Sequence, residues 1–145
     1  MLDIEAIRAR LPLRYPYLMI DRIIEESDGR VVALKNVTVN EPFFQGHFPE
    51  PLEAVMPGTL ILEAMAQTAA FLLAHGDAKE PLGGYLVGVE KARFRRKVVP
   101  GDQLRLEAER LRVRRGLVQA DVRVSVGGEP AASATISLLV AEGRP

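Results

Sequence analysis

A histidine and a glutamate in apolar surroundings are the residues of this chain best suited to chemistry. His47 lies between Gly46 and Phe48-Pro49, and Glu63 is the one acid in an apolar run over residues 58–75. A neutral imidazole can accept a proton. A carboxyl group in apolar surroundings favours its neutral form and can donate one. Removal of a proton next to a carbonyl group requires such a pair.

Each of these residues also has a purely structural interpretation. His47 can be hydrogen-bonded within its own loop, and Glu63 can face solvent or hold a loop amide. Gln67 follows Glu63 by one helical turn on the same face, so it can orient the carboxyl group through a hydrogen bond. The chemical interpretation gains weight because the candidate base and acid fall within 17 residues of each other.

The Pro57-Gly58 step adds a third possible element of a site. Gly58 begins a predicted helix, where backbone N–H groups lack intrahelical partners and the helix dipole is positive. Because glycine has no side chain, a substrate carbonyl oxygen can approach this N–H group, which would then act as an oxyanion hole. The alternative is that Pro57-Gly58 is simply where the helix starts.

Two further features suit substrate or partner binding. Tyr85 follows Gly83-Gly84 at the start of a predicted strand, where it is either the wall or gate of a pocket or an ordinary strand aromatic. The densest basic run is either a dock for an acidic partner or a solvated strand end, and it consists of Arg93, Arg95, Arg96 and Lys97.

Hydrophobic periodicity and turn residues predict the elements that position these groups. The expected ranges are a helix over 3–10 capped by Asp3, strands over 17–27 and 31–39, a packed loop over 40–57, a helix over 58–75, and strands over 84–95, 103–114, 118–126 and 132–140. A parity switch near Glu109 indicates a β-bulge. The long helix is apolar nearly all round and must be buried on most sides, and His75 at its end favours the helix dipole.

One apolar helix followed by sheet indicates an α+β fold in which a curved antiparallel sheet wraps a long central helix. Such a sheet leaves an apolar flank and exposed edges. We therefore expect two copies to form a dimer with a continuous sheet. A length of 145 residues predicts a single domain over 1–145.

Composition excludes several kinds of site and partner. A net charge of zero gives no reason to expect binding to nucleic acid or to an anionic membrane. With no cysteine and only two histidines, the chain offers no disulfide, thiolate nucleophile or evident metal site. The apolar helix is interrupted by Glu63 and Gln67, which argues against a membrane span. The first residues carry acids and no long apolar run, so a cytoplasmic location is expected.

The strings around these residues resemble a known family over nearly the whole chain. They are Leu11-Pro12, Arg14-Tyr15-Pro16, Asp21-Arg22, the run from Lys35 to Pro49, Met56-Pro57-Gly58, the run from Leu60 to Gln67, Gly88, the run from Lys91 to Arg95, and Val99 to Asp102. In these strings the chain is similar to the (3R)-hydroxyacyl-[acyl-carrier-protein] dehydratases of the FabZ type.

The resemblance implies a hotdog fold and dimers that often assemble as trimers of dimers. It also implies that His47 and Glu63 are the catalytic pair, contributed to one site by different subunits. The glycine N–H that binds the thioester matches Gly58, and the gating tyrosine matches Tyr85. Phe48 and Gln67 complete the expected substrate-binding residues, and the basic run is the expected dock for acyl carrier protein.

The activity implied is dehydration of (3R)-hydroxyacyl thioesters to trans-2-enoyl thioesters in fatty acid biosynthesis, with no cofactor. Three alternatives stay open: a hotdog acyl thioesterase, a hydratase acting on coenzyme A esters, and a non-catalytic acyl-thioester-binding subunit. Two departures from the family pattern bear on them. Leu13 stands where the family usually has histidine, and six residues instead of the usual four separate Pro49 from Met56.

Overall fold

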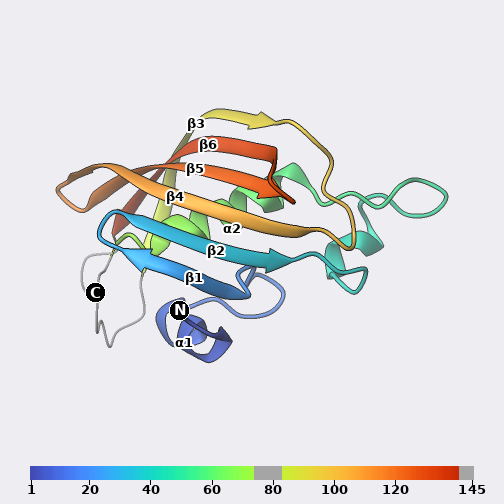
Figure 1. Ribbon diagram of the computed structural model, residues 1–145, viewed down its shortest axis with the longest axis horizontal. Coiled ribbons are helices and arrows are strands. Elements are labelled where there is room, and N and C mark those ends of the chain that lie inside the picture. Colours follow the sequence, from blue (N-terminus) through green and yellow to red (C-terminus); the bar gives the residue numbers. More distant parts are fainter. Residues whose placement is uncertain (74–82, 141–145) are drawn as a thin grey trace.

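A curved antiparallel sheet packed against one long helix forms the body of the protein (Figure 1). The computed structural model describes residues 1–73 and 83–140. Six strands follow the order β1-β2-β4-β5-β6-β3. The elements are α1 (Ile4–Arg10), β1 (Arg22–Ser27), β2 (Arg30–Asn36), the 3₁₀ helix η1 (Pro42–Gln45), α2 (Gly58–Ala70), β3 (Gly84–Phe94), β4 (Gln103–Arg114), β5 (Leu117–Val126) and β6 (Glu129–Val140). The expected α+β class is confirmed.

The core lies between α2 and the inner face of the sheet. Strand alternation places one set of aliphatic side chains inward and charged or polar ones outward. The buried set includes Leu104, Leu106, Ala108, Val118, Ala120, Val122, Val124, Ala134, Ile136 and Leu138. Gly127 and Gly128 form the hairpin turn between β5 and β6, both with positive φ. The predicted bulge near Glu109 is confirmed by a register shift between Arg110 and Arg112.

The central helix is shorter than its apolar run suggested. α2 ends at Ala70, and Phe71 and Leu72 donate their N–H groups to carbonyls three residues earlier, so the last turn is tighter. His75 lies outside the described residues. Burial agrees with the prediction, since Thr59 is the one exposed residue of α2. Among the helices of the described ranges, none combines the length and the apolar character needed to cross a membrane.

Both strands of the first hairpin are shorter than predicted. β1 begins at Arg22 rather than at residue 17, because residues 14–17 form a turn in which Tyr17 donates to the carbonyl of Arg14. Tyr17 and Met19 bond to a side chain of α2 instead of to a strand. β2 ends at Asn36 rather than at residue 39. The chain turns over residues 38–41, where the N–H of Glu41 donates to the carbonyl of Thr38.

The two edges of the sheet are β1 and β3. β3 pairs with β6 on one side only, and nearly all of its residues are exposed in the single chain. Its exposed side chains include Tyr85, Leu86, Val87, Val89 and Phe94. An open edge of this length offers unpaired backbone groups and exposed apolar side chains to which another strand could pair.

Candidate active site

His47 is held at the end of a short helical turn. Its N–H group donates to the carbonyl of Phe43 at 3.0 Å, just after η1. Its ring Nδ1 lies 2.7 Å from the carbonyl oxygen of Val55. A carbonyl can only accept, so Nδ1 carries a proton, and in the neutral imidazole the lone pair is then on Nε2. The bond within the loop therefore leaves His47 suited to act as a base.

The loop around His47 is only partly packed. Phe44 and Met56 are buried, whereas Phe48 and Leu52 are exposed, so the expectation of a packed loop is wrong for the second pair. The Phe48 ring stacks on the imidazole of His47 with centroids 4.2 Å apart. This stacking gives the imidazole an apolar face.

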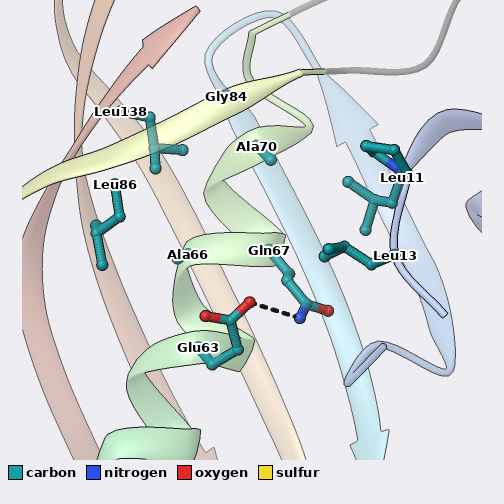
Figure 2. Close-up of a pocket in the computed structure, with 10 residues that line it drawn as sticks. Leu11, Leu13, Glu63, Ala66, Gln67, Ala70, Gly84, Leu86 and Leu138 are labelled. Carbon is teal, nitrogen blue, oxygen red and sulfur yellow. Dashed lines mark hydrogen bonds between the residues drawn. The ribbon is translucent and has the colours of Figure 1, made fainter. Parts of the chain in front are cut away.

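Glu63 lies on α2 with its carboxyl group held by Gln67. The Nε2 group of Gln67 donates to Oε1 of Glu63 at 2.9 Å and to the carbonyl oxygen of Tyr17 at 2.7 Å (Figure 2). The side-chain oxygen of Gln67 accepts the N–H of Met19 at 2.8 Å. Gln67 is 3% exposed, so its amide is fixed at both ends and the carboxyl of Glu63 is oriented by it.

A mostly apolar cavity of about 170 Å³ begins at this carboxyl group. Figure 2 shows it running along α2 from Glu63 past Ala66 to Ala70, with strand residues on one side and the segment before β1 on the other. Its lining residues are Leu11, Pro12, Leu13, Glu63, Ala66, Gln67, Ala70, Gly84, Leu86 and Leu138. Glu63 is half-buried at this wall and bonds to Gln67, so it holds no loop amide among the described residues.

Gly58 lies at a second hollow, of about 430 Å³, at the N-terminus of α2. A side-chain carbon at this position would come within 3.2 Å of the Phe94 ring, so only glycine fits here without a shift. Leu60 and Ile61 donate their N–H groups to the carbonyl of Pro57, whereas the N–H groups of Gly58 and Thr59 precede the first hydrogen bond of the helix and lie at its positive end. The hollow is thus suited to an electron-rich oxygen.

Basic residues form one wall of this second hollow, and two of the four in the run are already paired. Arg96 bonds to Asp102 and Glu129, and Lys97 bonds to Glu53 at 2.7 Å. Arg95 donates to the Ser133 hydroxyl and Arg93 to a backbone carbonyl, so these two make no ion pair within the described residues.

A single chain does not bring all the predicted site residues together. Glu63 and Gln67 share the first cavity, and His47 bonds to Val55 of the second hollow. Gly58 lines that second hollow together with Arg95, Arg96 and Lys97, whereas Arg93 does not line it. His47 is not among the described residues that line the cavity of Glu63. Tyr85 is 65% exposed on β3 and, within the described chain, lines neither.

Known sequences match this chain over most of its length. The profile of the FabA-like domain matches residues 11–135. The 3-hydroxyacyl-[acyl-carrier-protein] dehydratase FabZ of Deinococcus radiodurans is 53% identical over 133 residues, which cover 92% of this chain and 90% of that protein. The FabZ of Thermus thermophilus is 53% identical over 141 residues, 96% of this chain and 97% of that one. The chain belongs to the FabZ dehydratase family.

FabZ-type dehydratases are hydro-lyases. Solved structures with the same fold as this chain are also known. The dehydratase heterocomplex ApeI:P from Xenorhabdus doucetiae matches with a TM-score of 0.80 at 18% identity, over 94% of this chain and 91% of that one. An uncharacterized protein of Pyrococcus horikoshii matches with a TM-score of 0.70 at 17% identity, over 99% and 98%. At such identities the likeness concerns the fold, which is the expected hotdog fold.

The two places that the sequence analysis singled out as departures from the expected pattern both lie near the candidate residues. Leu13 gives the cavity of Glu63 an aliphatic wall. The segment over residues 50–55 supplies the Val55 carbonyl that bonds to His47, and its Glu53 pairs with Lys97.

Sequence reasoning missed the groups that hold the two candidate catalytic residues. Val55 and Tyr17 act through backbone carbonyls and Met19 through its N–H, and a side-chain motif carries no sign of such contacts. Leu13 stands out in the sequence as a departure from the family, but nothing in the sequence marks it as a wall of the cavity.

Proposed function

We propose that this chain removes water from (3R)-hydroxyacyl thioesters carried by acyl carrier protein and yields trans-2-enoyl thioesters for fatty acid biosynthesis. Family membership over nearly the whole chain supports this reaction. The structural observation that carries it is the Glu63 carboxyl, held by Gln67 at the wall of an apolar cavity. An acyl chain can lie in that cavity with its polar end at the acid.

In the proposed mechanism, Nε2 of His47 removes a proton from C2 of the substrate. The developing negative charge on the thioester oxygen is stabilised by the N–H of Gly58 and the dipole of α2. Glu63 then donates a proton to the leaving hydroxyl group, directly or through water. The C2–H and C3–O bonds break and a C2=C3 double bond forms. The hydroxyl leaves as water with the proton of Glu63, His47 keeps the C2 proton, and transfer of this proton from His47 to Glu63, directly or through water, restores both residues. Neither an oxidant nor a reductant takes part in this elimination.

We propose that the reaction uses two copies of the chain, since His47 does not line the cavity of Glu63 within one copy. We place His47 of one protomer against Glu63 of its partner. The open apolar edge of β3 supports a dimer in which the two β3 strands pair and the sheet continues across the interface. A trimer of such dimers is the assembly we expect.

The carrier protein would dock at the second hollow. Arg95 in this hollow and Arg93 beside it on β3 are its proposed contacts, since Arg96 and Lys97 already have carboxylate partners. From this side the thioester would reach Gly58, and Phe48 and Tyr85 remain proposed substrate contacts.

The test is conversion of a (3R)-hydroxyacyl carrier to the enoyl product. The rate is compared with that for the corresponding coenzyme A ester, and a thiol reagent detects any free thiol that is released. We expect enoyl product, a preference for the carrier and no free thiol. His47→Ala and Glu63→Gln should each lower kcat at least about 100-fold. Glu26→Gln, a carboxyl outside both hollows, serves as the control. Release of thiol would favour a thioesterase, and rates near wild type in both site variants would overturn the assigned roles.

A further inference from the structure

One buried cation has no place in the proposed reaction. Lys35, Gln67 and Thr68 are the polar side chains buried within the described part of the chain, and of these only Lys35 carries a charge. It lies on β2 in register with Leu104 and shares the inward parity of Val31 and Ala33. Burying an ammonium group among core side chains is costly unless a partner offsets the loss of water.

The partner of Lys35 lies at the start of the segment that carries His47. Nζ of Lys35 donates to Oε1 of Glu41 at 2.9 Å, and the two side chains are 4% and 19% exposed. The carbonyl of Glu41 accepts the N–H of Phe44 at 3.1 Å, and the carbonyl of Phe43 accepts the N–H of His47. The ion pair therefore ties the turn from which His47 extends to the end of β2.

The other side of His47 is anchored to the same corner of the sheet. The Val55 carbonyl accepts the imidazole N–H, and the next residue, Met56, donates its N–H to Val98 at 2.8 Å. Val37, just after β2, exchanges hydrogen bonds with Gly101 and Asp102. His47 is thus held on one side by the turn that Glu41 ties to β2, and on the other by Val55, whose neighbour Met56 bonds to Val98.

We propose that Lys35 and Glu41 are positioning residues for His47, and that their buried ion pair fixes residues 42–47 so that Nε2 faces the substrate. The proposal rests on the role of His47 in the proposed function. Loss of either charge leaves the other buried and unpaired, so the turn must shift to bring it to water. A displacement of the base by about 1 Å can cost a rate factor of about 100.

A matched control exists elsewhere in the chain. Arg10 and Glu26 form another inner ion pair, with side chains 11% and 17% exposed and an N···O distance of 2.9 Å. It joins α1 to β1 and has no assigned part in catalysis. Lys35→Met is therefore compared with Arg10→Met, and Glu41→Gln with Glu26→Gln, each for kcat, KM and melting temperature.

We expect Lys35→Met and Glu41→Gln to lower kcat about 10- to 100-fold while KM for the acyl carrier stays within about threefold. Lys35→Arg keeps the charge and should recover most of the lost rate. The Arg10 and Glu26 variants should have a lower melting temperature than wild type and an unchanged kcat. If Lys35→Met does not fold, Glu41→Gln alone carries the test, since it keeps the size of the side chain and removes only the charge that offsets Lys35.

Nitrogen NMR of the imidazole gives a readout that general loosening of the fold would not reproduce. The chain has only two histidines, so selective ¹⁵N-histidine labelling gives two ring systems, and His47→Ala assigns them. Wild type should show the Nδ1–H tautomer for His47. In Glu41→Gln the ring should shift toward a tautomer mixture, whereas in Glu26→Gln it should not.

Two outcomes would overturn the proposal by itself: a kcat within twofold of wild type in both Lys35→Met and Glu41→Gln, or an equal loss in the matched control pair. In these cases His47→Ala is still inactive, and the proposed function stands. Activity that survives in His47→Ala would instead overturn the role of His47, and the positioning proposal with it.

Discussion

Gln67 is the residue on which the geometry of the candidate acid depends. Its buried amide bonds to Glu63, Tyr17 and Met19 at once, so it joins the carboxyl to the segment before β1. Within the described ranges, Gln67 is the hydrogen-bond donor that holds the Glu63 carboxyl in place. The acid and the first part of the chain are therefore coupled through one side chain.

Gln67→Met should weaken both the fold and the reaction. It removes the bond that orients Glu63 and leaves a buried carbonyl and N–H without partners, which we expect to cost about 3 kcal/mol of unfolding free energy. The kcat should fall about 10-fold or more, because the carboxyl is no longer oriented. Urea unfolding and steady-state kinetics measure the two effects.

Thr68→Val is the matched control for this prediction. Thr68 is the next residue of α2, is fully buried, and its hydroxyl bonds to the carbonyl of Ala64 in its own helix. The Thr68→Val variant should lose at most about 1 kcal/mol of unfolding free energy and keep the kcat of wild type. An equal loss of kcat in both variants would contradict the orienting role of Gln67.

At the scale of elements, α2 sets the length of the cavity. Small side chains at Ala66 and Ala70 leave room beside the helix, and Ala70 lies seven residues beyond Glu63, a rise of about 10 Å. Gly84 and Leu138 line the end of the cavity near Ala70 (Figure 2). Side-chain volume at residue 70 should therefore limit the acyl chain that fits.

Ala70→Leu should shift the substrate preference toward short acyl chains. The added side chain fills the end of the cavity farthest from the acid, so kcat/KM for long chains should fall about 10-fold or more while short chains react as before. The measurement is the ratio of kcat/KM for long and short hydroxyacyl carriers. An unchanged ratio would mean that the acyl chain lies elsewhere.

The outer face of the sheet carries a charge network that gives the stability of the fold a pH dependence. A hydrogen bond from Arg105, with further positive charge from Arg30, holds the pKa of Glu107 below its usual value of 4.5. A lowered pKa means that the stabilisation is complete above pH 4.5 and is lost as the pH falls through the lower value in the folded state.

Glu107→Gln should therefore be less stable than wild type at pH 7, by less than about 1 kcal/mol because the pair is partly solvated. The difference should shrink as the pH falls from about 5 to about 3. Urea unfolding at several pH values measures it, and a difference that does not change over this range would contradict the assignment.

Strands, turns and the helix could be predicted from alternation and glycine positions because each depends on local physics. The start of β1 could not, since Tyr17 and Met19 bond to Gln67, which is distant in the sequence. His47 and Glu63 could be named from their types and surroundings. The hydrogen bond between the Val55 carbonyl and His47 could not be predicted, because every residue has a backbone carbonyl and the sequence does not mark this one.

At the scale of the whole molecule, the open edge of β3 and the separation of His47 from Glu63 have the same explanation. Pairing of two β3 strands would cover the apolar edge, and we propose that it also completes each site with a residue from the partner. A substitution that prevents this pairing should then abolish both dimer formation and activity.

Val87→Lys on the open edge should give monomers without activity, because a charge would be buried at the centre of the pairing surface. Val113→Lys is a matched control, since the two valines are 54% and 55% exposed and Val113 lies on the β4–β5 hairpin. Light scattering with chromatography measures the mass. An active Val87→Lys monomer would contradict a site built from two chains.

Mixing the two inactive variants tests the central claim most directly. His47→Ala and Glu63→Gln proteins are unfolded and refolded together, so that their subunits exchange. If each site takes its histidine and glutamate from different chains, about half the dimers are mixed and each has one intact site, which restores about a quarter of wild-type activity. A mixture as inactive as either parent, with mixed dimers present by mass spectrometry, would contradict the shared site.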